Sequence, residues 1–192
     1  MTDEEGDVTE LNLQLNSDGY VEFCNSIDHA GTPDADEFTW EMEYDTEGHL
    51  VVMKRSESDG EITNITYKDG DVVKTSTRYV ASGDLNGDGI IDSNDEWEYS
   101  AAIDYTTDNI TAPIENKGCL MLFDEILDVD MDEMIYAYYG GMLGKATKHL
   151  PLVGHYTYNG EDSVSDMYFT WTLNSDSYPT ELVVKDQWDE YR

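Results

Sequence analysis

The chain has 192 residues, of which 39% are apolar and 11% aromatic, so it is long and apolar enough to bury one sizeable core. It carries 43 acidic against 10 basic side chains, and its formal net charge of −33 repels phosphate backbones and anionic membrane surfaces, which excludes nucleic acid as a partner. No apolar run reaches the roughly 20 residues that a membrane-spanning helix needs.

The N-terminal segment is acidic and has no apolar pattern. It includes Asp3, Glu4 and Glu5. We expect residues 1–10 to form a disordered acidic tether and residues 11–192 to form a single β-rich domain. Contact with a membrane is expected only through a lipid anchor on an N-terminal segment that has been removed.

Three hairpins are predicted before residue 80. In each, two segments that alternate apolar and polar residues flank a turn rich in Asn, Asp and Gly, which is the pattern of an antiparallel hairpin. The paired segments are residues 11–15 with 20–23, 38–44 with 50–53, and 62–67 with 72–73. Charged residues along the strands, such as Glu41, Glu43 and Glu61, argue against a membrane barrel and favour a soluble curved sheet with one wet face.

Residues 83–96 read GDLNGDGIIDSNDE and set oxygen ligands at the spacing of an EF-hand calcium loop. The sharp turn at the sixth loop position is taken by Gly89. The last ligand is an Asp where EF-hands have a Glu, a variant that resembles the calcium loops of dockerin modules. We expect one Ca²⁺ as cofactor, held by Asp84, Asn86, Asp88, the Ile90 carbonyl, Asp92 and Asp95.

The segments on both sides of this loop, residues 75–80 and 97–105, alternate with period two. Strands therefore enter and leave the loop, and the metal is expected at the tip of a long hairpin. Without a cation the clustered carboxylates repel one another, so calcium should order the tip. The alternative is a polar turn, rich in Asp and Gly, that binds nothing.

The hairpin pattern stops between residues 108 and 151. Apolar residues near helical spacing from 124 to 141 predict one or two short helices within a helical insertion at 120–145. Their apolar stripe is expected to pack on the open side of the sheet.

Hairpins resume after this insertion, around residues 156–158 and between 167–173 and 182–184. The fold class that follows is mainly β. We expect an antiparallel meander of about ten strands that forms a curved sheet or a half or closed barrel, with one or two short helices packed on its open side.

The sequence has no recognisable catalytic motif. The four histidines, His29, His49, His149 and His155, have neither metal-ligand spacing nor a nucleophile motif nearby. The only cysteines, Cys24 and Cys119, form either one disulfide or two buried thiols and have no metal-ligand spacing. We therefore expect that the protein is not an enzyme.

Two segments carry a family resemblance. Residues 138–151 read YYGGMLGKATKHLP, and residues 67–74 read YKDGDVVK. With them the chain resembles, over residues 35–190, a family of exported lipoprotein domains of unknown function from Bacteroides-type bacteria, described as having a porin-like fold. The resemblance implies an exported protein of the cell surface or periplasm, lipid-anchored in its precursor. It supplies no catalytic residue, and the calcium loop looks like an insertion into one of the family's hairpins.

Three functions follow as hypotheses. The first is a non-enzymatic cell-envelope or surface module, stabilised by one calcium ion, that binds a glycan or an envelope protein; exposed aromatic residues on a strand face, such as Trp171 and Trp188, would favour it. The second is a carrier that holds an apolar ligand between the half-barrel and the helix. Its cavity would be lined by Met121, Phe123, Met134 and Trp40. The third is a hydrolase, which would need a cleft with convergent carboxylates of perturbed pKa.

Overall fold

The computed structural model describes residues 8–56, 60–80, 83–84, 87–92, 95–124, 126–131, 134–158, 165–186 and 190–191. Of the predicted tether, residues 1–7 lie outside this range, and Glu10 already begins the first strand. The elements in chain order are β1 (Glu10–Leu15), β2 (Val21–Asp28), β3 (Asp36–Tyr44), β4 (Leu50–Arg55), β5 (Glu61–Lys68), β6 (Asp71–Val80), β7 (Glu96–Asp104), β8 (Ile114–Glu115), α1 (Ile135–Tyr139), β9 (His149–Leu150), β10 (Val153–Tyr158), β11 (Ser165–Leu173), β12 (Pro179–Lys185) and β13 (Glu190–Tyr191).

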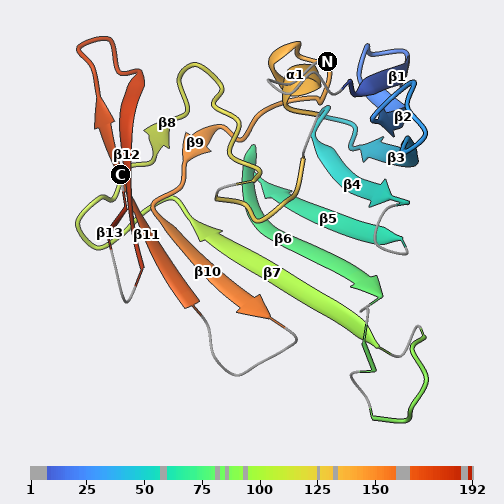
Figure 1. The fold of residues 1–192 in the computed structure, drawn as a ribbon. Coiled ribbons are helices and arrows are strands. Elements are labelled where there is room, and N and C mark those ends of the chain that lie inside the picture. The colour runs from blue at the N-terminus through green and yellow to red at the C-terminus, as the bar shows by residue number, and fades with distance from the viewer. Residues whose placement is uncertain are drawn as a thin grey trace.

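Eleven of these strands form one antiparallel sheet, in the order β1-β2-β3-β4-β5-β6-β7-β10-β11-β12-β13. Every strand pairs with the one before it in the chain except at β7–β10, where the chain leaves the sheet and returns (Figure 1). The sheet is curved and, within the described residues, does not close, because β1 and β13 remain its two edges. The predicted curved meander is thus confirmed, and its closed-barrel variant is not formed.

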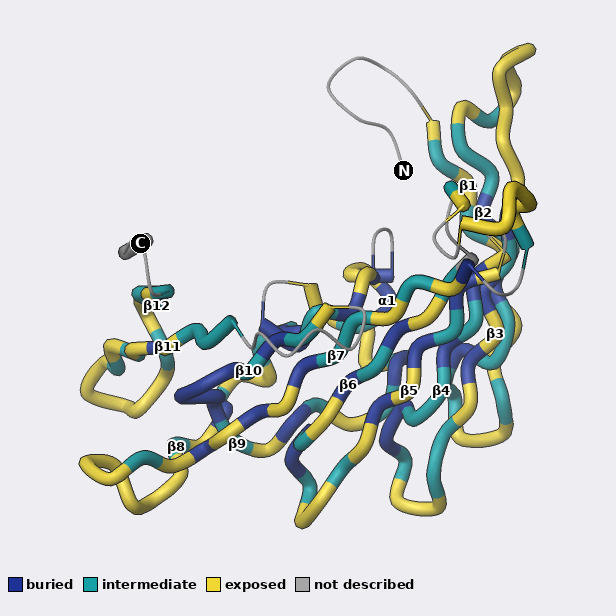
Figure 2. The backbone as a smooth tube through the Cα atoms, turned by 90° about the horizontal axis from the view of Figure 1, so that it is seen from below, coloured by how far each residue is buried: buried dark blue, intermediate teal, exposed yellow. Residues whose placement is uncertain are grey.

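The segment between β7 and β10 covers one face of the sheet. Its side chains Ile126, Leu127 and Met131 are at most 1% exposed. Two strand residues donate hydrogen bonds to its backbone, Thr75 Oγ1 to the Leu127 carbonyl (2.6 Å) and Tyr156 Oη to the Ile126 carbonyl (2.6 Å). The core therefore lies between this segment and the sheet, and buried and exposed positions alternate along β4 to β7 (Figure 2).

This segment contains one α-helix among its described residues, the five-residue α1. The prediction of one or two short helices is confirmed by α1, but the apolar spacing began at residue 124, and the described residues between 122 and 131 form turns and irregular backbone instead. There Asp124 Oδ1 accepts the Met131 N–H at 2.8 Å, and Asp128 has a positive φ of 53°. Both features end a helical path, since a side chain takes the place of a backbone acceptor and the left-handed conformation breaks the repeat.

One expected surface residue proved to be buried. Glu61 was predicted on the wet face, yet it is 8% exposed and faces the core side, where Arg55 lies 3.9 Å away. The burial is possible because the cation of Arg55 lies between Glu61 and Asp130, at 2.6 Å from the latter. The alternation of residues along a strand predicts which side chains share a face of the sheet. A pair of charged side chains can nevertheless lie on the buried face.

The two cysteines are free thiols. Cys24 is buried, as expected, whereas Cys119 is exposed and has a positive φ of 51°. The disulfide alternative is therefore not formed, and the expectation of two buried thiols is right only for Cys24.

Within the described chain, no helix has the length and apolar character required to cross a membrane.

Candidate functional site

A row of aromatic side chains crosses strands β6, β7 and β10 on the same side of the sheet as the covering segment. The register pairs Tyr79 with Trp97, Thr77 with Tyr99, and Tyr99 with Tyr158. Since residues two apart on a strand share a face, these side chains continue the face on which Thr77 is buried. We call Tyr79, Tyr99 and Tyr158 the aromatic row.

The rings of the aromatic row contact one another. Ring centroids are 6.3 Å apart for Tyr79 and Tyr99 and 6.4 Å apart for Tyr99 and Tyr158, within the range of favourable aromatic pairs. Tyr158 is 43% exposed, while Tyr79, Tyr99 and the neighbouring Trp97 are half-buried. Burial raises the pKa of Tyr99 and of Tyr158, and neighbouring carboxylates add to both shifts. Both hydroxyls therefore stay protonated at neutral pH and can donate hydrogen bonds.

An acidic pocket of about 310 Å³ opens beside Tyr99. Its other lining residues are Asp124, Asp128, Val129 and Asp130. Two of the carboxylates are held by the fold, Asp124 by the Met131 N–H and Asp130 by Arg55. The third, Asp128, has a pKa raised by burial, and its buried Oδ2 accepts no hydrogen bond from the described residues.

The predicted calcium loop connects β6 to β7, at the end of the hairpin that carries Tyr79 and Tyr99. The Asp84 carboxylate accepts three backbone N–H groups, from Gly87 (2.6 Å), Asp88 (3.2 Å) and Gly89 (2.8 Å). The loop therefore curls around the first predicted ligand. Near its end, Asp95 is fully buried and accepts the Asp92 N–H at 3.0 Å.

The remaining predicted ligands are placed as follows. Asp88 Oδ1 accepts the Ile90 N–H at 2.8 Å, and the Ile90 side chain is 60% exposed. Asn86 lies outside the described residues. In the part of the chain that is described, no three His, Cys, Asp or Glu side chains gather as a metal site. The donors are all oxygens, the kind that Ca²⁺ prefers, so the donor set fits the ion while the calcium site itself stays a prediction.

Sequence reasoning missed three histidine–aspartate pairs. His49 Nδ1 lies 3.0 Å from Asp45, His149 Nδ1 lies 2.8 Å from Asp71, and His155 Nδ1 lies 2.7 Å from Asp166. The hydrogen bond to Asp166 raises the pKa of His155. The His149 and His155 pairs each join two different strands, so no short sequence pattern indicates them. Only the His49 pair, whose residues are four positions apart, could have been found from the sequence.

Of the two aromatic residues expected to mark a binding face, the structure describes only Trp171. Trp171 is half-buried and donates its Nε1–H to the Pro151 carbonyl at 2.7 Å, and Trp188 lies outside the described residues. Three of the residues expected to line a carrier cavity, Phe123, Met134 and Trp40, are 3%, 0% and 0% exposed and belong to the hydrophobic core. The fourth residue, Met121, lines a different, mostly apolar pocket of about 320 Å³ with Trp171.

The open meander has solved structural counterparts. One is a porin-like protein from Bacteroides vulgatus, with a TM-score of 0.64 and 15% identity, where the match covers 95% of this chain and 77% of that one. Another is a porin-like protein from Bacteroides uniformis, with a TM-score of 0.62 and 21% identity over 99% of this chain and 68% of the other. At this identity the likeness shows the fold alone, and it defines a porin-like β-sheet domain.

The sequence comparison then gives the family. Residues 1–181 match the family described as "Domain of unknown function (DUF4595) with porin-like fold". The chain belongs to this family. The match starts at residue 1, whereas the resemblance seen in the sequence was placed from residue 35. No curated protein matches the chain significantly.

Proposed function

We propose that this protein is a non-enzymatic binding module of the cell envelope that takes a neutral saccharide against the aromatic row and the acidic pocket. The observation that carries the proposal is their adjacency, since Tyr99 belongs to both. A pyranose ring presents polarised C–H groups to the negative face of an aromatic ring. Its hydroxyl groups donate to carboxylates in short, charge-assisted hydrogen bonds.

Charge defines the saccharide further. With a net charge of −33 and three aspartates around the pocket, the site repels uronic acids, sialic acids and sulfated sugars. Neutral hexoses and N-acetylhexosamines remain as the fitting class.

Replacing Tyr158 with alanine is expected to weaken saccharide binding about fivefold, since it removes a ring face worth roughly 1 kcal/mol. The measurement is a screen of immobilised neutral oligosaccharides followed by calorimetry on the best of them. Tyr158 is 43% exposed, so the variant should fold. The matched control is Tyr168→Ala, because Tyr168 is 48% exposed on β11, outside the aromatic row. Equal losses in both variants, or preferential binding of acidic sugars, would refute the saccharide site.

The second part of the proposal is a stabilising calcium ion in the loop of residues 83–96. The support is the oxygen spacing of the loop and the way its backbone wraps around the Asp84 carboxylate. Calcium would fix the end of the β6–β7 hairpin and so keep Tyr79 and Trp97 in place beside the ligand. Extracellular calcium fills such loops even when their dissociation constants are about 10⁻⁴ to 10⁻³ M.

Calcium at about ten times its dissociation constant should raise the melting temperature by about 3 to 6 °C, because it stabilises the folded state by roughly 1.4 kcal/mol. In Asp88→Asn the rise should vanish, since a ligand charge is lost while the side chain can still accept the Ile90 N–H. Asp18→Asn, in the exposed turn before β2, is the control and should keep the full response. Chelator-treated protein is titrated by calorimetry and melted in parallel; an unaltered response in Asp88→Asn would remove the calcium assignment.

An envelope location is the third part of the proposal. Its support is the family's porin-like fold and the two porin-like structures from Bacteroides. In this setting the acidic N-terminal segment would be the spacer behind a lipid anchor, and an envelope protein is the alternative partner. A carrier of an apolar ligand is the alternative, although Phe123, Met134 and Trp40, which were expected to line its cavity, belong to the hydrophobic core.

Hydrolysis is the second candidate function, since the acidic pocket holds a carboxylate, Asp128, whose pKa burial raises. Glycoside hydrolysis needs two free carboxylates on opposite sides of the bond. Asp124 accepts a backbone N–H and Asp130 pairs with Arg55, which favours binding without cleavage. Cleavage of the same oligosaccharides, lost in Asp128→Asn, would favour the hydrolase instead.

A further inference from the structure

A larger pocket, separate from the saccharide site, lies where α1, the start of β9 and the turn after β8 meet. Its volume is about 630 Å³, within the range of small-molecule sites. Its wall is mostly apolar, with Tyr138 and Tyr139 on one side. We call it the lysine pocket because Lys145 and Lys148 both line it.

The backbone that carries these two lysines is fixed on both sides of the pocket. The Lys145 N–H donates to the Gly48 carbonyl (2.8 Å) and the Lys148 N–H to the Gly70 carbonyl (3.0 Å). The lysine pocket thus rests on the turns of the β3–β4 and β5–β6 hairpins, and the backbone from which both lysine side chains extend has a defined position.

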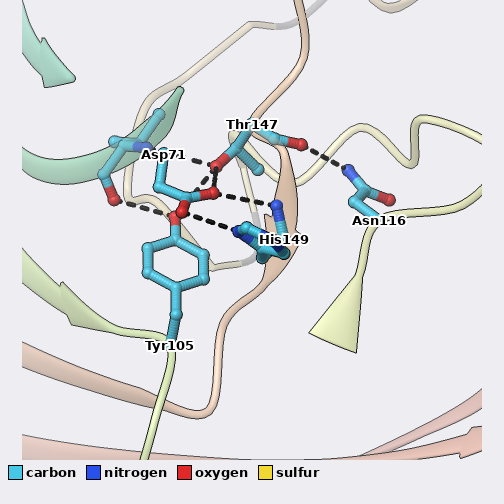
Figure 3. A network of polar contacts seen from close by, with 6 residues as sticks. Asp71, Tyr105, Asn116, Thr147 and His149 are labelled. Carbon is cyan, nitrogen blue, oxygen red and sulfur yellow. Dashed lines mark hydrogen bonds and ion pairs between the residues drawn. The ribbon is translucent and has the colours of Figure 1, made fainter. Parts of the chain in front are cut away.

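A buried polar network supports the segment that lines the lysine pocket (Figure 3). Asp71 accepts the backbone N–H of His149 and faces its Nδ1, both at 2.8 Å. The Thr147 hydroxyl lies 3.0 Å from the Tyr105 hydroxyl, and the Thr147 carbonyl accepts the Asn116 amide at 3.1 Å. Side chains from β6, the end of β7, the turn after β8 and β9 thereby converge on the segment between Lys145 and His149. A built site of this kind holds its shape without a ligand.

The charges of this pocket are unusual for so acidic a chain. Lys145 and Lys148 are exposed, and no carboxylate among the described residues lies within 4.0 Å of either ammonium group. Lys54, by comparison, pairs with Glu43 at 3.1 Å. The lining holds one carboxylate, Glu115, and one histidine, His49, which already faces Asp45. The pocket therefore offers two cations to a ligand in a chain of net charge −33.

The apolar wall defines the rest of the ligand. Tyr139 is 61% exposed, and its ring meets that of Tyr138 edge to face at 5.3 Å. The Tyr138 hydroxyl donates to the Leu120 carbonyl, so its ring is held in place. An apolar or aromatic body can pack on these rings while an anionic end reaches the lysines. A ligand with several negative charges would meet the repulsion of the whole molecule, whereas a single charge is offset locally by the two lysines.

We propose that the lysine pocket binds a small amphipathic monoanion, an apolar body that ends in one carboxylate or sulfonate. This site is independent of the saccharide site, because the two share no lining residue. The protein would thus hold two ligands of different chemistry in separate pockets.

The test uses 8-anilinonaphthalene-1-sulfonate, a fluorescent amphipathic monoanion, with the neutral N-phenyl-1-naphthylamine as its uncharged counterpart. In Lys145→Gln/Lys148→Gln the dissociation constant of the sulfonate should rise about tenfold or more, while that of the neutral probe stays within about twofold. The control is Lys74→Gln/Lys185→Gln, which makes the same change in net charge at exposed lysines on β6 and β12. Decanoate should displace the sulfonate from the wild-type protein, which extends the result to carboxylates.

Three outcomes would overturn the proposal. Equal weakening in both double variants would show an effect of net charge alone. An unchanged sulfonate affinity in Lys145→Gln/Lys148→Gln would place the probe elsewhere, for instance in the apolar pocket beside Trp171. Equal affinity of the wild type for the charged and neutral probes would assign the pocket to a neutral apolar ligand. Saccharide affinity is measured on the same variants and should stay unchanged, so failure of one site is distinguishable from failure of the other.

Discussion

Replacing Arg55 with methionine is expected to lower the free energy of unfolding by about 3 kcal/mol. The Arg55 side chain is 4% exposed, with its guanidinium 2.6 Å from Asp130, 3.9 Å from Glu61 and 4.4 Å from the ring centroid of Trp40. Methionine fills a similar volume but leaves the 10%-exposed Glu61 carboxylate without its cation. Removing one partner of a buried ion pair costs about 3 to 5 kcal/mol, and the lower end applies because Asp130 is 46% exposed.

Urea denaturation followed by tryptophan fluorescence measures this loss. The double variant Arg55→Met/Glu61→Gln should recover at least half of it, because the buried carboxylate is then removed along with its partner. The loss should extend to saccharide binding, since Asp130 lines the acidic pocket and Arg55 holds it. A single variant within about 0.5 kcal/mol of the wild type would show that water already screens the pair.

The substitution Gly144→Ala should destabilise the protein by a similar amount, about 3 kcal/mol. Gly144 has φ +76°, and a Cβ there would lie 2.4 Å from the Gly48 carbonyl oxygen and 3.1 Å from the Tyr44 ring. The left-handed conformation alone costs a non-glycine residue about 1 to 2 kcal/mol. The contact adds to this, because the Gly48 carbonyl accepts the Lys145 N–H and cannot move away without breaking that bond.

Gly141→Ala is the matched control for this prediction. Gly141 has nearly the same φ, +73°, but a Cβ there would meet nothing within 4 Å. It should therefore lose only the conformational part, about 1 kcal/mol. The difference between the two free energies of unfolding isolates the close approach of the two backbones. Equal losses would mean that the segment before β9 can shift away from the β3–β4 turn.

The local features of the fold were predictable from the sequence. The alternation in residues 38–44 and 50–53 places β3 and β4 to within two residues at each end, because a period of two repeats at every position of a strand. The turn before β2, with its Asn16 cap over the N–H groups of Asp18 and Tyr20, was equally visible. In the covering segment one short helix was predicted correctly as α1, but the apolar spacing before it belongs to a buried non-helical path that includes Asp124 and Asp128.

The candidate sites were predictable only in part. The calcium loop could be proposed from the sequence because all its expected ligands lie within one short segment, and it stays a prediction. The aromatic row was not, since Tyr79, Tyr99 and Tyr158 meet only through the register of three strands, one of them more than fifty residues away. The same holds for Asp71 and His149, whose contact spans 78 positions. Sequence patterns report neighbours along the chain, whereas these sites are made by pairing between distant strands.

The pairing of β7 with β10, two strands that are not consecutive in the chain, affects how the protein folds during its synthesis. Strands β1 to β7 pair in the order in which they leave the ribosome, so each hairpin can close as soon as its second strand emerges. The β7–β10 pairing has to wait for residues 105–152, which lie between the two strands in the chain. We expect the first seven strands to assemble during synthesis, and the step that limits the rate of folding to be the docking of this late segment onto a waiting sheet.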